Sequence, residues 1–499
     1  MAERVSILDL RKVSAGEEER KAFFLDLNIS QIIDKMAVRW GQGIRKLYAY
    51  FPADKECEAY RREVYGDFKR EEIYQCCMAF VERLGRVEEF RTLRGKVRSP
   101  MQSGVYQIRE MDAYCRAFGT LAQELSKAQP ESRGLKDFLA YLQELLSSEA
   151  YQKMQSTCAK VLEELLGFRF VITYEKDRMM VALGESEGSY EDFLKTFGDP
   201  DRPPLTSPFF ASNMISELEN SCLDILAKKR PQIFQTLQRT AEEFTSYEDE
   251  GLLQFTRELP FYLSFATFQR EMSELGFVFC TPEVHEEKRM EARGLYDLAL
   301  AIVAHREGRR VVSNDMYYGE EESFFVLTGP NQGGKTTFAR SLGQLVYFAK
   351  MGLDVPAVSA NVHYFKDIQT HFSVEESIET GRGKLKEELI RLAPMMEEHR
   401  SGTFVVINEL FTTAASYDAR IMGGKVLTHF IELGCRGIYV THLKELTEIH
   451  PRVVSLRAML DQERLQTFEI KRSEAEESAC AANQVNKYRL TYEQLKERL

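Results

Sequence analysis

The sequence contains no run of about 18 apolar residues, so nothing in it is expected to span a lipid bilayer. The first twenty residues, "MAERVSILDLRKVSAGEEER", also lack the apolar core of a secretion signal. Nine cysteines are scattered without paired spacing, a pattern that argues against a disulfide framework or a zinc site. Together these absences predict a cytoplasmic protein with reduced thiols and no membrane segment.

Basic residues are in the minority: 66 lysines and arginines stand against 77 aspartates and glutamates, and the formal net charge is −11. Such a chain does not attract nucleic acid through its overall field, so any such binding requires a local basic patch. Tryptophan occurs once, at Trp40, and no aromatic residues alternate with basic ones as in proteins that stack single-stranded bases. Trp40 is therefore expected to be a packing residue.

The chain is longer than one compact core, since 499 residues favour two or more domains. Residues 20–165 place apolar side chains three and four positions apart, which predicts successive helices. Residues 168–183 predict a β-hairpin, and residues 184–213 gather glycine, proline and serine as a connector does. Helices resume over 213–276, and from about residue 293 strands and helices alternate, which is typical of a sheet with helices on its faces.

The clearest motif lies in "FFVLTGPNQGGKTTFARSL", residues 324–342, where a buried-type strand meets a glycine-rich turn and a helix. Residues 329–336 fit the phosphate-loop pattern G-x-x-x-x-G-K-[ST] without a mismatch. Glycines let backbone N–H groups approach phosphates, and the helix N-terminus favours negative charge. Lys335 is predicted to reach the β- and γ-phosphates of ATP, and the Thr336 hydroxyl to bind Mg²⁺. The predicted nucleotide-binding residues are Gly329, Pro330, Asn331, Gln332, Gly333, Gly334, Lys335, Thr336 and Thr337.

Two further predicted strands end in polar residues. "TFVVINEL" (403–410) ends with Asn408 and Glu409, at the edge where open α/β sheets place their chemistry. Asn408 is predicted to share the metal site with Thr336, and Glu409 to activate the attacking water. An amide keeps the oxygen acceptor without the charge of an aspartate, so turnover is expected to be slow. "GIYVTH" (437–442) ends in His442, a candidate sensor of the γ-phosphate; alone, such a histidine would more often be a packing or capping residue.

These strand ends, in this order, resemble the ATPase domain of the MutS family within the ABC class. "GPNQGGKTT" resembles the GPNMGGKST of that family, and "INELFTTAASYDA" resembles its DEIGRGTSTYDG but lacks the first aspartate and the glycines. "VTHLKELTEI" and "LDVPA" are similar to two further segments of the same family. The similarity covers roughly residues 290–495.

The resemblance implies a fold: an α/β P-loop ABC-type ATPase domain together with a large, mainly α-helical lever or clamp domain carrying a small β-hairpin. It implies a lead-in at 1–20, a helical region at 21–290, the ATPase domain at 291–470 and C-terminal dimerising helices at 471–499. The first 100 residues, Phe80-Val81-Glu82 included, already resemble the helical lever region and no Smr domain follows, so a shortened relative that does not read mismatches is expected.

The resemblance also implies a homodimer in which ATP and Mg²⁺ are held between two subunits. The partner's contribution would come from a trans-acting loop, predicted at Gly381, Arg382, Gly383 and Lys384. The usual serine of that loop falls at Gly383, which is a second departure from the family at this composite site. Apart from the family, "GRGKLK" is a glycine turn before an exposed basic helix. The residue that stacks on adenine is unassigned, and Tyr296 is a guess from its place before the first strand.

Basic residues that could contact DNA occur in two places. Phosphate contacts need only such patches and would give salt-sensitive, sequence-independent binding. The alternative is a solvated helix face paired with acidic neighbours. The candidates are Arg83, Arg86, Arg91, Arg94, Lys96 and Arg98, and further along the chain Lys228, Lys229 and Arg230.

Three functions remain open from the sequence. The first is a homodimeric ATPase that opens and closes a helical clamp on duplex or branched DNA. The second keeps the ATPase but takes a ribosome or another RNA–protein assembly as its client. The third is a weakly hydrolysing, nucleotide-gated interaction protein, favoured by Asn408 and Gly383.

Overall fold

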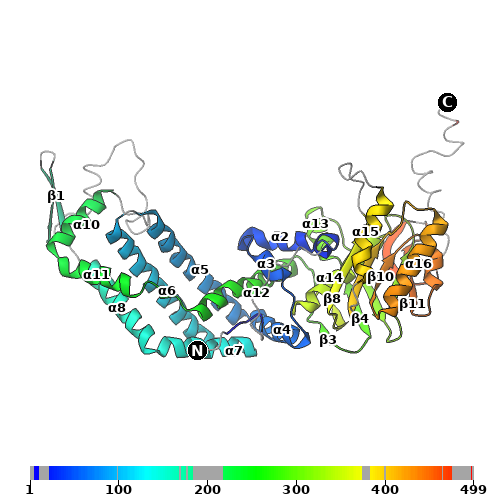
Figure 1. Ribbon diagram of the computed structural model, residues 1–499, viewed down its shortest axis with the longest axis horizontal. Helices are drawn as coiled ribbons and strands as arrows, with labels where there is room; N and C mark the ends of the chain where they lie inside the picture. Colours follow the sequence, from blue (N-terminus) through cyan, green and yellow to red (C-terminus); the bar gives the residue numbers. More distant parts are fainter. Residues whose placement is uncertain are drawn as a thin grey trace. The chain divides into compact units, whose positions relative to one another are not determined.

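The computed structural model describes residues 5–9, 22–97, 99–167, 170–175, 178–183, 217–373, 383–397, 401–463, 465–474 and 496. The helices are α1 (Phe23–Asp26), α2 (Ile29–Trp40), α3 (Ile44–Ala49), α4 (Lys55–Lys69), α5 (Glu71–Lys96), α6 (Pro100–Ala128), α7 (Arg133–Ser147), α8 (Glu149–Leu166), α10 (Glu217–Lys229), α11 (Pro231–Glu243), α12 (Glu250–Glu274), α13 (Leu298–Arg306), α14 (Lys335–Lys350), α15 (Lys384–Glu397), α16 (Ser416–Glu432) and the 3₁₀ helix η1 (Lys444–Glu448) (Figure 1). The strands are β1 (Phe170–Glu175), β2 (Arg178–Leu183), β3 (Glu283–His285), β4 (Met290–Leu295), β5 (Asn314–Tyr318), β6 (Phe324–Thr328), β7 (Ser359–His363), β8 (Asp367–Phe372), β9 (Thr403–Asn408), β10 (Arg436–Val440), β11 (Val453–Leu460) and β12 (Gln466–Arg472).

The chain forms two compact units, and each combines segments that are separated in the sequence. The first unit contains residues 1–5 and 69–257, and the second contains residues 6–68 and 258–499. The predicted domain boundaries at residues 20, 290 and 470 stay predictions. The predicted connector at 184–213 and the predicted C-terminal helices beyond residue 474 lie outside the described residues, apart from residue 496.

The first unit is mainly helical. Helices α5 and α6 pack along each other, and α7, α8 and α11 each pack against α6. Aromatic rings fill the interior: Phe138 stacks on Phe255 with ring centroids 3.6 Å apart. Strands β1 and β2 pair antiparallel with Glu175 opposite Arg178, which confirms the hairpin predicted over 168–183.

The second unit contains two mixed sheets. The six-stranded sheet has the order β12-β11-β6-β10-β9-β8, and the four-stranded sheet has the order β3-β7-β4-β5. Within the larger sheet, β11, β6, β10, β9 and β8 are parallel, whereas β12 joins β11 antiparallel at the edge. Because β6, β9 and β10 run parallel, their C-terminal ends meet at one edge, where the sequence predicted the chemistry.

The central strands are buried on both faces, as their apolar runs predicted. Every residue of β6, β9 and β10 is buried. Helix α14 packs against β8, β9 and β10. Helix α16 packs against every second residue of the central strands, because successive side chains of a strand point to opposite faces of the sheet. The strand residues in the core cluster with α16 are Phe324, Val326, Val405, Ile407 and Tyr439.

The N-terminal helices belong to the second unit because α14 binds them directly. The Gln344 side-chain amide donates to the carbonyl oxygen of Leu27 (2.9 Å), and its oxygen accepts the N–H of Leu298 (2.8 Å). One turn further on, the Tyr347 hydroxyl donates to the carbonyl oxygen of Tyr48 (2.8 Å). Since Gln344 and Tyr347 are completely buried, these bonds satisfy polar groups that would be costly to leave unpaired.

The described cysteines are all free thiols. Within the described ranges, every helix is too short or too polar to cross a lipid bilayer.

Candidate nucleotide site at the sheet edge

The predicted nucleotide-binding loop connects β6 to α14. Gln332 (φ 63°) and Gly334 (φ 87°) adopt left-handed backbone conformations, and Gly334 immediately precedes the helix. The Lys335 side chain is 4% exposed, and its Nζ donates to the carbonyl oxygens of Gly329 (3.0 Å) and Pro330 (2.9 Å). The lysine ammonium is therefore held inside the ring of the loop.

Thr336 and Asn408 lie in contact although 72 positions separate them in the sequence. The Thr336 hydroxyl donates to Oδ1 of Asn408 at 2.9 Å, across the gap between the start of α14 and the end of β9. The pair offers two neutral oxygen ligands. This set fits Mg²⁺, which prefers oxygen and commonly takes its other ligands from substrate phosphates and water.

Glu409 follows β9 in a left-handed conformation, with φ at 55°. Its N–H donates to the carbonyl oxygen of Val440 (3.0 Å), so β10 holds the backbone here. Its carboxylate oxygen Oε1 lies 3.3 Å from Nε2 of His442, and the two side chains are 30% and 46% exposed. A non-glycine residue in this conformation costs free energy on the order of 1 kcal/mol, and such strain gathers at functional sites. The predicted pair of catalytic residues is thus adjacent and reachable from solvent.

The predicted trans-acting loop is described only in part. Gly383 is exposed and precedes α15, whereas Gly381, Arg382 and the side chain of Lys384 lie outside the described residues. Their proposed contact with a second subunit stays a prediction.

Glu388, which the sequence analysis did not single out, reaches the same region from α15. The residue is 1% exposed, and its Oε2 accepts the N–H of Phe411 at 3.1 Å. A signal was present, because Leu385, Glu388 and Leu392 follow helical spacing and Glu388 falls on the apolar stripe. It was obscured by the other charges of "KLKEELIRL".

Tyr296 does not lie open to a base, and the guess that it stacks on adenine is wrong. Its side chain is 6% exposed, its hydroxyl donates to the carbonyl oxygen of Val278 (3.1 Å), and its ring packs beside Phe277 and Phe279. In the structure Tyr296 directly follows β4, and it packs into the core where the chain turns from β4 into α13.

A hollow of ≈ 730 Å³ is lined by residues of β4, β5, β6, β11, β12 and the first turn of α14. Asn314 in its lining bonds to the backbone of β12, donating to the carbonyl oxygen of Phe468 at 3.2 Å. Phe468 in turn lies against Gly334 of the loop. The lining mixes apolar residues (Met316, Phe338, Leu456, Ile470) with polar ones (Arg293, Asn314, Asp315). This hollow is a candidate place for the nucleoside.

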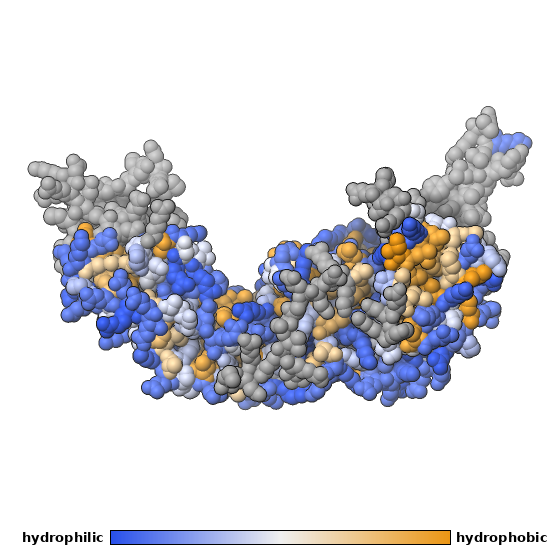
Figure 2. Space-filling model, in the orientation of Figure 1, coloured by the Kyte–Doolittle hydropathy of each residue, from blue (hydrophilic) through white to orange (hydrophobic). Residues whose placement is uncertain are grey.

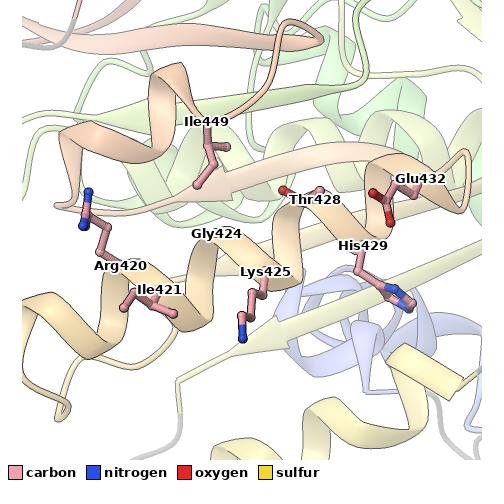
Figure 3. A pocket seen from close by; sticks show the side chains of 8 residues that line it. All are labelled: Arg420, Ile421, Gly424, Lys425, Thr428, His429, Glu432 and Ile449. Atoms are coloured by element: carbon pink, nitrogen blue, oxygen red, sulfur yellow. The ribbon is translucent and has the colours of Figure 1, made fainter.

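A second hollow, of ≈ 570 Å³, lies on the outer side of α16 (Figure 3). Its lining comes from α16 and from Ile449 after η1, and includes none of the residues predicted to bind nucleotide or metal. His429 in this lining is bonded to α15, with Nε2 3.1 Å from the carbonyl oxygen of Met396.

The structure pairs three of the DNA-binding candidates with carboxylates. Arg83 donates twice to Glu124 (2.9 and 2.7 Å), Arg91 donates to the buried Glu110 (2.9 Å), and Arg94 lies 3.3 Å from Glu110. These contacts favour the interpretation of a paired helix face for these arginines. Their role on DNA stays a prediction.

The remaining basic candidates differ. Arg86, Lys96, Lys228, Lys229 and Arg230 are exposed, and Arg98 lies outside the described residues.

Comparison with known proteins agrees with this site. Residues 325–485 match the family described as MutS domain V, and this segment contains β9, β10 and all of β6 except Phe324. Through this segment the chain is similar to the MutS family.

Three relatives illustrate the extent of the match, each named DNA mismatch repair protein MutS. The protein of Thermotoga maritima is 26% identical over 246 residues, covering 49% of this chain and 30% of the relative. That of Thermotoga sp. strain RQ2 is 30% identical over 169 residues, or 34% and 21% of the two chains, and that of Thermotoga neapolitana is 26% identical over 321 residues, or 64% and 38%. The chain studied here therefore covers less than two-fifths of the length of each of these three proteins.

Proposed function

We propose that this MutS relative is a homodimeric ATPase that acts on DNA, and that its nucleotide cycle opens and closes a helical clamp on duplex or branched DNA. One observation carries the ATPase part: Lys335, the Thr336–Asn408 pair and the Glu409–His442 pair converge at the C-terminal ends of three parallel strands. Mismatch recognition is no part of the proposal.

In the proposed reaction the loop residues bind the phosphates through backbone N–H groups, and Lys335 exchanges its carbonyl partners in the loop for phosphate oxygens. Thr336 and Asn408 would hold Mg²⁺, which when bound neutralises phosphate charge. Glu409 accepts the proton of the attacking water, and His442 orients the Glu409 carboxylate. Because Asn408 brings no charge to the metal site, the expected turnover is slow.

The surface near α15 and α16 supports dimerisation. Figure 2 shows apolar area gathered over these helices, and their exposed apolar side chains are Leu389, Ile390, Tyr417 and Ile421. A sizeable exposed apolar patch commonly marks an interaction surface. A second copy of the chain, with ATP between the two, is the proposed occupant.

ATP binding and turnover of Lys335→Ala and Glu409→Ala against the unmodified protein test the reaction. Lys335→Ala is expected to weaken ATP binding, whereas Glu409→Ala is expected to keep binding and to lower kcat roughly 100-fold, since general base catalysis typically contributes 10²–10⁴-fold. Lys160→Ala, which removes an exposed lysine of α8, is the control.

Unchanged turnover in both variants would refute the assigned site. A single-chain species in sedimentation with ATP and Mg²⁺ bound would refute the dimer.

A nucleotide-gated protein with little hydrolysis is the second candidate, and the Thr336–Asn408 contact favours it because the metal would meet only neutral ligands. Asn408→Asp separates the two. A large gain in hydrolysis would indicate that the natural protein is built to bind rather than to turn over. An unchanged or lower rate would favour a working ATPase with an amide at this position.

A further inference from the structure

The turn after β9 is unusual because two of its residues, Glu409 (φ 55°) and Phe411 (φ 61°), adopt left-handed conformations without being glycine. Such conformations persist when surrounding contacts impose them. Leu410 and Phe411 are 3% and 1% exposed, so the turn is packed into the core while the Glu409 carboxylate emerges beside His442.

Each end of this turn is held by one hydrogen bond from a different element. The N–H of Glu409 donates to Val440 of β10, and the N–H of Phe411 donates to the Glu388 carboxylate of α15 at 3.1 Å. The first bond continues the sheet. The second is made by a charged side chain that α15 buries completely, at a considerable desolvation cost that good hydrogen bonds must offset.

Helix α15 is itself fastened to the sheet, so the Glu388 carboxylate has a defined position. Nε2 of His371 on β8 lies 3.3 Å from the carbonyl oxygen of Glu388, and the Arg391 guanidinium donates to the carbonyl oxygen of Phe372 (3.1 Å). Burial lowers the pKa of His371 to about 4, so this ring is neutral at ordinary pH. The buried Tyr439 of β10 also lies close to Glu388, since burial first and the Glu388 carboxylate second raise the pKa of its hydroxyl.

We infer that Glu388 is a positioning residue for Glu409: by accepting the Phe411 N–H it holds the turn in its left-handed form and so directs the Glu409 carboxylate toward His442 and the strand ends. The inference rests on the proposed ATPase function. Without this bond Phe411 relaxes toward a negative φ, and the Glu409 carboxylate turns away from the site. Helix α15 begins directly after Gly383, so the Glu388 contact couples the placement of this helix to that of Glu409.

Three variants test the inference. Glu388→Ala removes the acceptor, Glu388→Gln keeps an oxygen acceptor without the charge, and Glu387→Ala removes the neighbouring charge as a matched control. We expect Glu388→Ala to lower kcat for ATP roughly 10- to 100-fold with KM within about 3-fold, because the loop that binds phosphate is untouched. Glu388→Gln is expected to recover kcat to within about 3-fold of the unmodified protein, and Glu387→Ala to change neither constant.

Hydrogen exchange in the nucleotide-free protein supplies a measurement that does not depend on activity. The Phe411 amide should exchange at least about 10-fold faster in Glu388→Ala, and near the unmodified rate in Glu388→Gln. If Glu388→Ala does not fold, the Glu388→Gln protein tests the inference. It keeps an oxygen acceptor, so its kcat and the exchange protection of its Phe411 amide should both stay near normal.

Equal changes in kcat and KM, loss of activity in Glu388→Gln, or unchanged exchange in a folded Glu388→Ala protein would each overturn the inference. A protein that neither binds nor hydrolyses ATP would overturn the proposed function instead. The exchange result would then still decide whether Glu388 holds the turn.

Discussion

Glu58 on α4 is a carboxylate in an environment built for a neutral group. The side chain is 0% exposed, and among the described residues neither of its oxygens has a hydrogen-bond partner. Its ion-pair partner is Arg62, with Nη1 3.6 Å from Oε1. Burial raises the pKa of Glu58 to about 7, against the opposing effects of Arg62, Lys55 and Lys350.

This pKa predicts that Glu58 makes the second unit less stable as the pH rises. The unfolded carboxyl titrates near 4.5 and the folded one near 7, so the folded state binds more protons between these values. Stability from Glu58 is therefore present below about pH 4.5 and lost as the pH passes through about 7. Calorimetric unfolding at pH 5 and pH 8 should show a smaller pH dependence for Glu58→Gln, by up to about 3 kcal/mol.

The difference between the two proteins is the quantity to read, because other groups titrate in the same range. Burial lowers the pKa of His363 to about 4. The folded protein therefore loses stability through His363 as the pH falls below the ordinary histidine pKa. Identical pH dependence in the two proteins would contradict the assignment to Glu58.

At the scale of elements, β10 and β9 approach more closely at Gly437 than any side chain allows. A Cβ built on Gly437 would lie 1.8 Å from the carbonyl oxygen of Val405 and 2.8 Å from its carbonyl carbon. Backbone atoms cannot give way as a flexible side chain can. The register that brings Asn408 opposite Val440 therefore depends on this glycine.

Gly437→Ala is expected to destabilise the second unit by about 3 kcal/mol or more, or to prevent folding, because the added carbon overlaps a strand. Gly43→Ala is the matched control, since a Cβ there meets nothing within 4 Å, and it should change stability by about 0.5 kcal/mol or less. Chemical unfolding measures both. A Gly437→Ala protein of normal stability would mean that the strands are not in this register.

Elements with a strong local pattern could be predicted from the sequence. Strands β6, β9 and β10 were recognisable as short apolar runs that end in polar residues, and the loop between β6 and α14 by its glycines. The contact of Gln344 with Leu27 could not be predicted from the sequence, because the two residues are 317 positions apart and neither carries a local signal for the other. For Glu388 the helical spacing indicated a place on the apolar stripe of α15, but its partner could not be predicted, because a backbone N–H leaves no trace in the sequence.

For the whole molecule the balance of charge limits how DNA could be bound. The chain carries a net charge of −11, and Arg83, Arg91 and Arg94 are engaged with glutamates. The exposed cations at the end of α10, Lys228, Lys229 and Arg230, are freer to meet phosphates. If DNA is the client, these three side chains should dominate the salt dependence of binding.

Replacing Lys228, Lys229 and Arg230 by alanine should weaken DNA binding and reduce the slope of log K against log salt by about 1 for each phosphate that is no longer neutralised. Arg83→Gln, which removes an arginine already paired with Glu124, should leave the slope unchanged. Titration of duplex and branched DNA over a salt series measures both. Equal slopes in all three proteins would place the DNA-binding surface elsewhere, and no DNA binding at any salt would favour an RNA–protein client.

The docking of the N-terminal helices onto α14 has a consequence for the order in which the chain folds during synthesis. Residues 6–68 leave the ribosome long before Gln344 and Tyr347 exist, whereas residues 69–257 are contiguous and can complete their own packing first. Leu27 and Tyr48, both 0% exposed in the finished protein, must then wait for partners that are translated 317 and 299 positions later. Until residues 258–499 are made, residues 6–68 therefore present an apolar face without its partners, which a chaperone would cover or which could cause premature self-association.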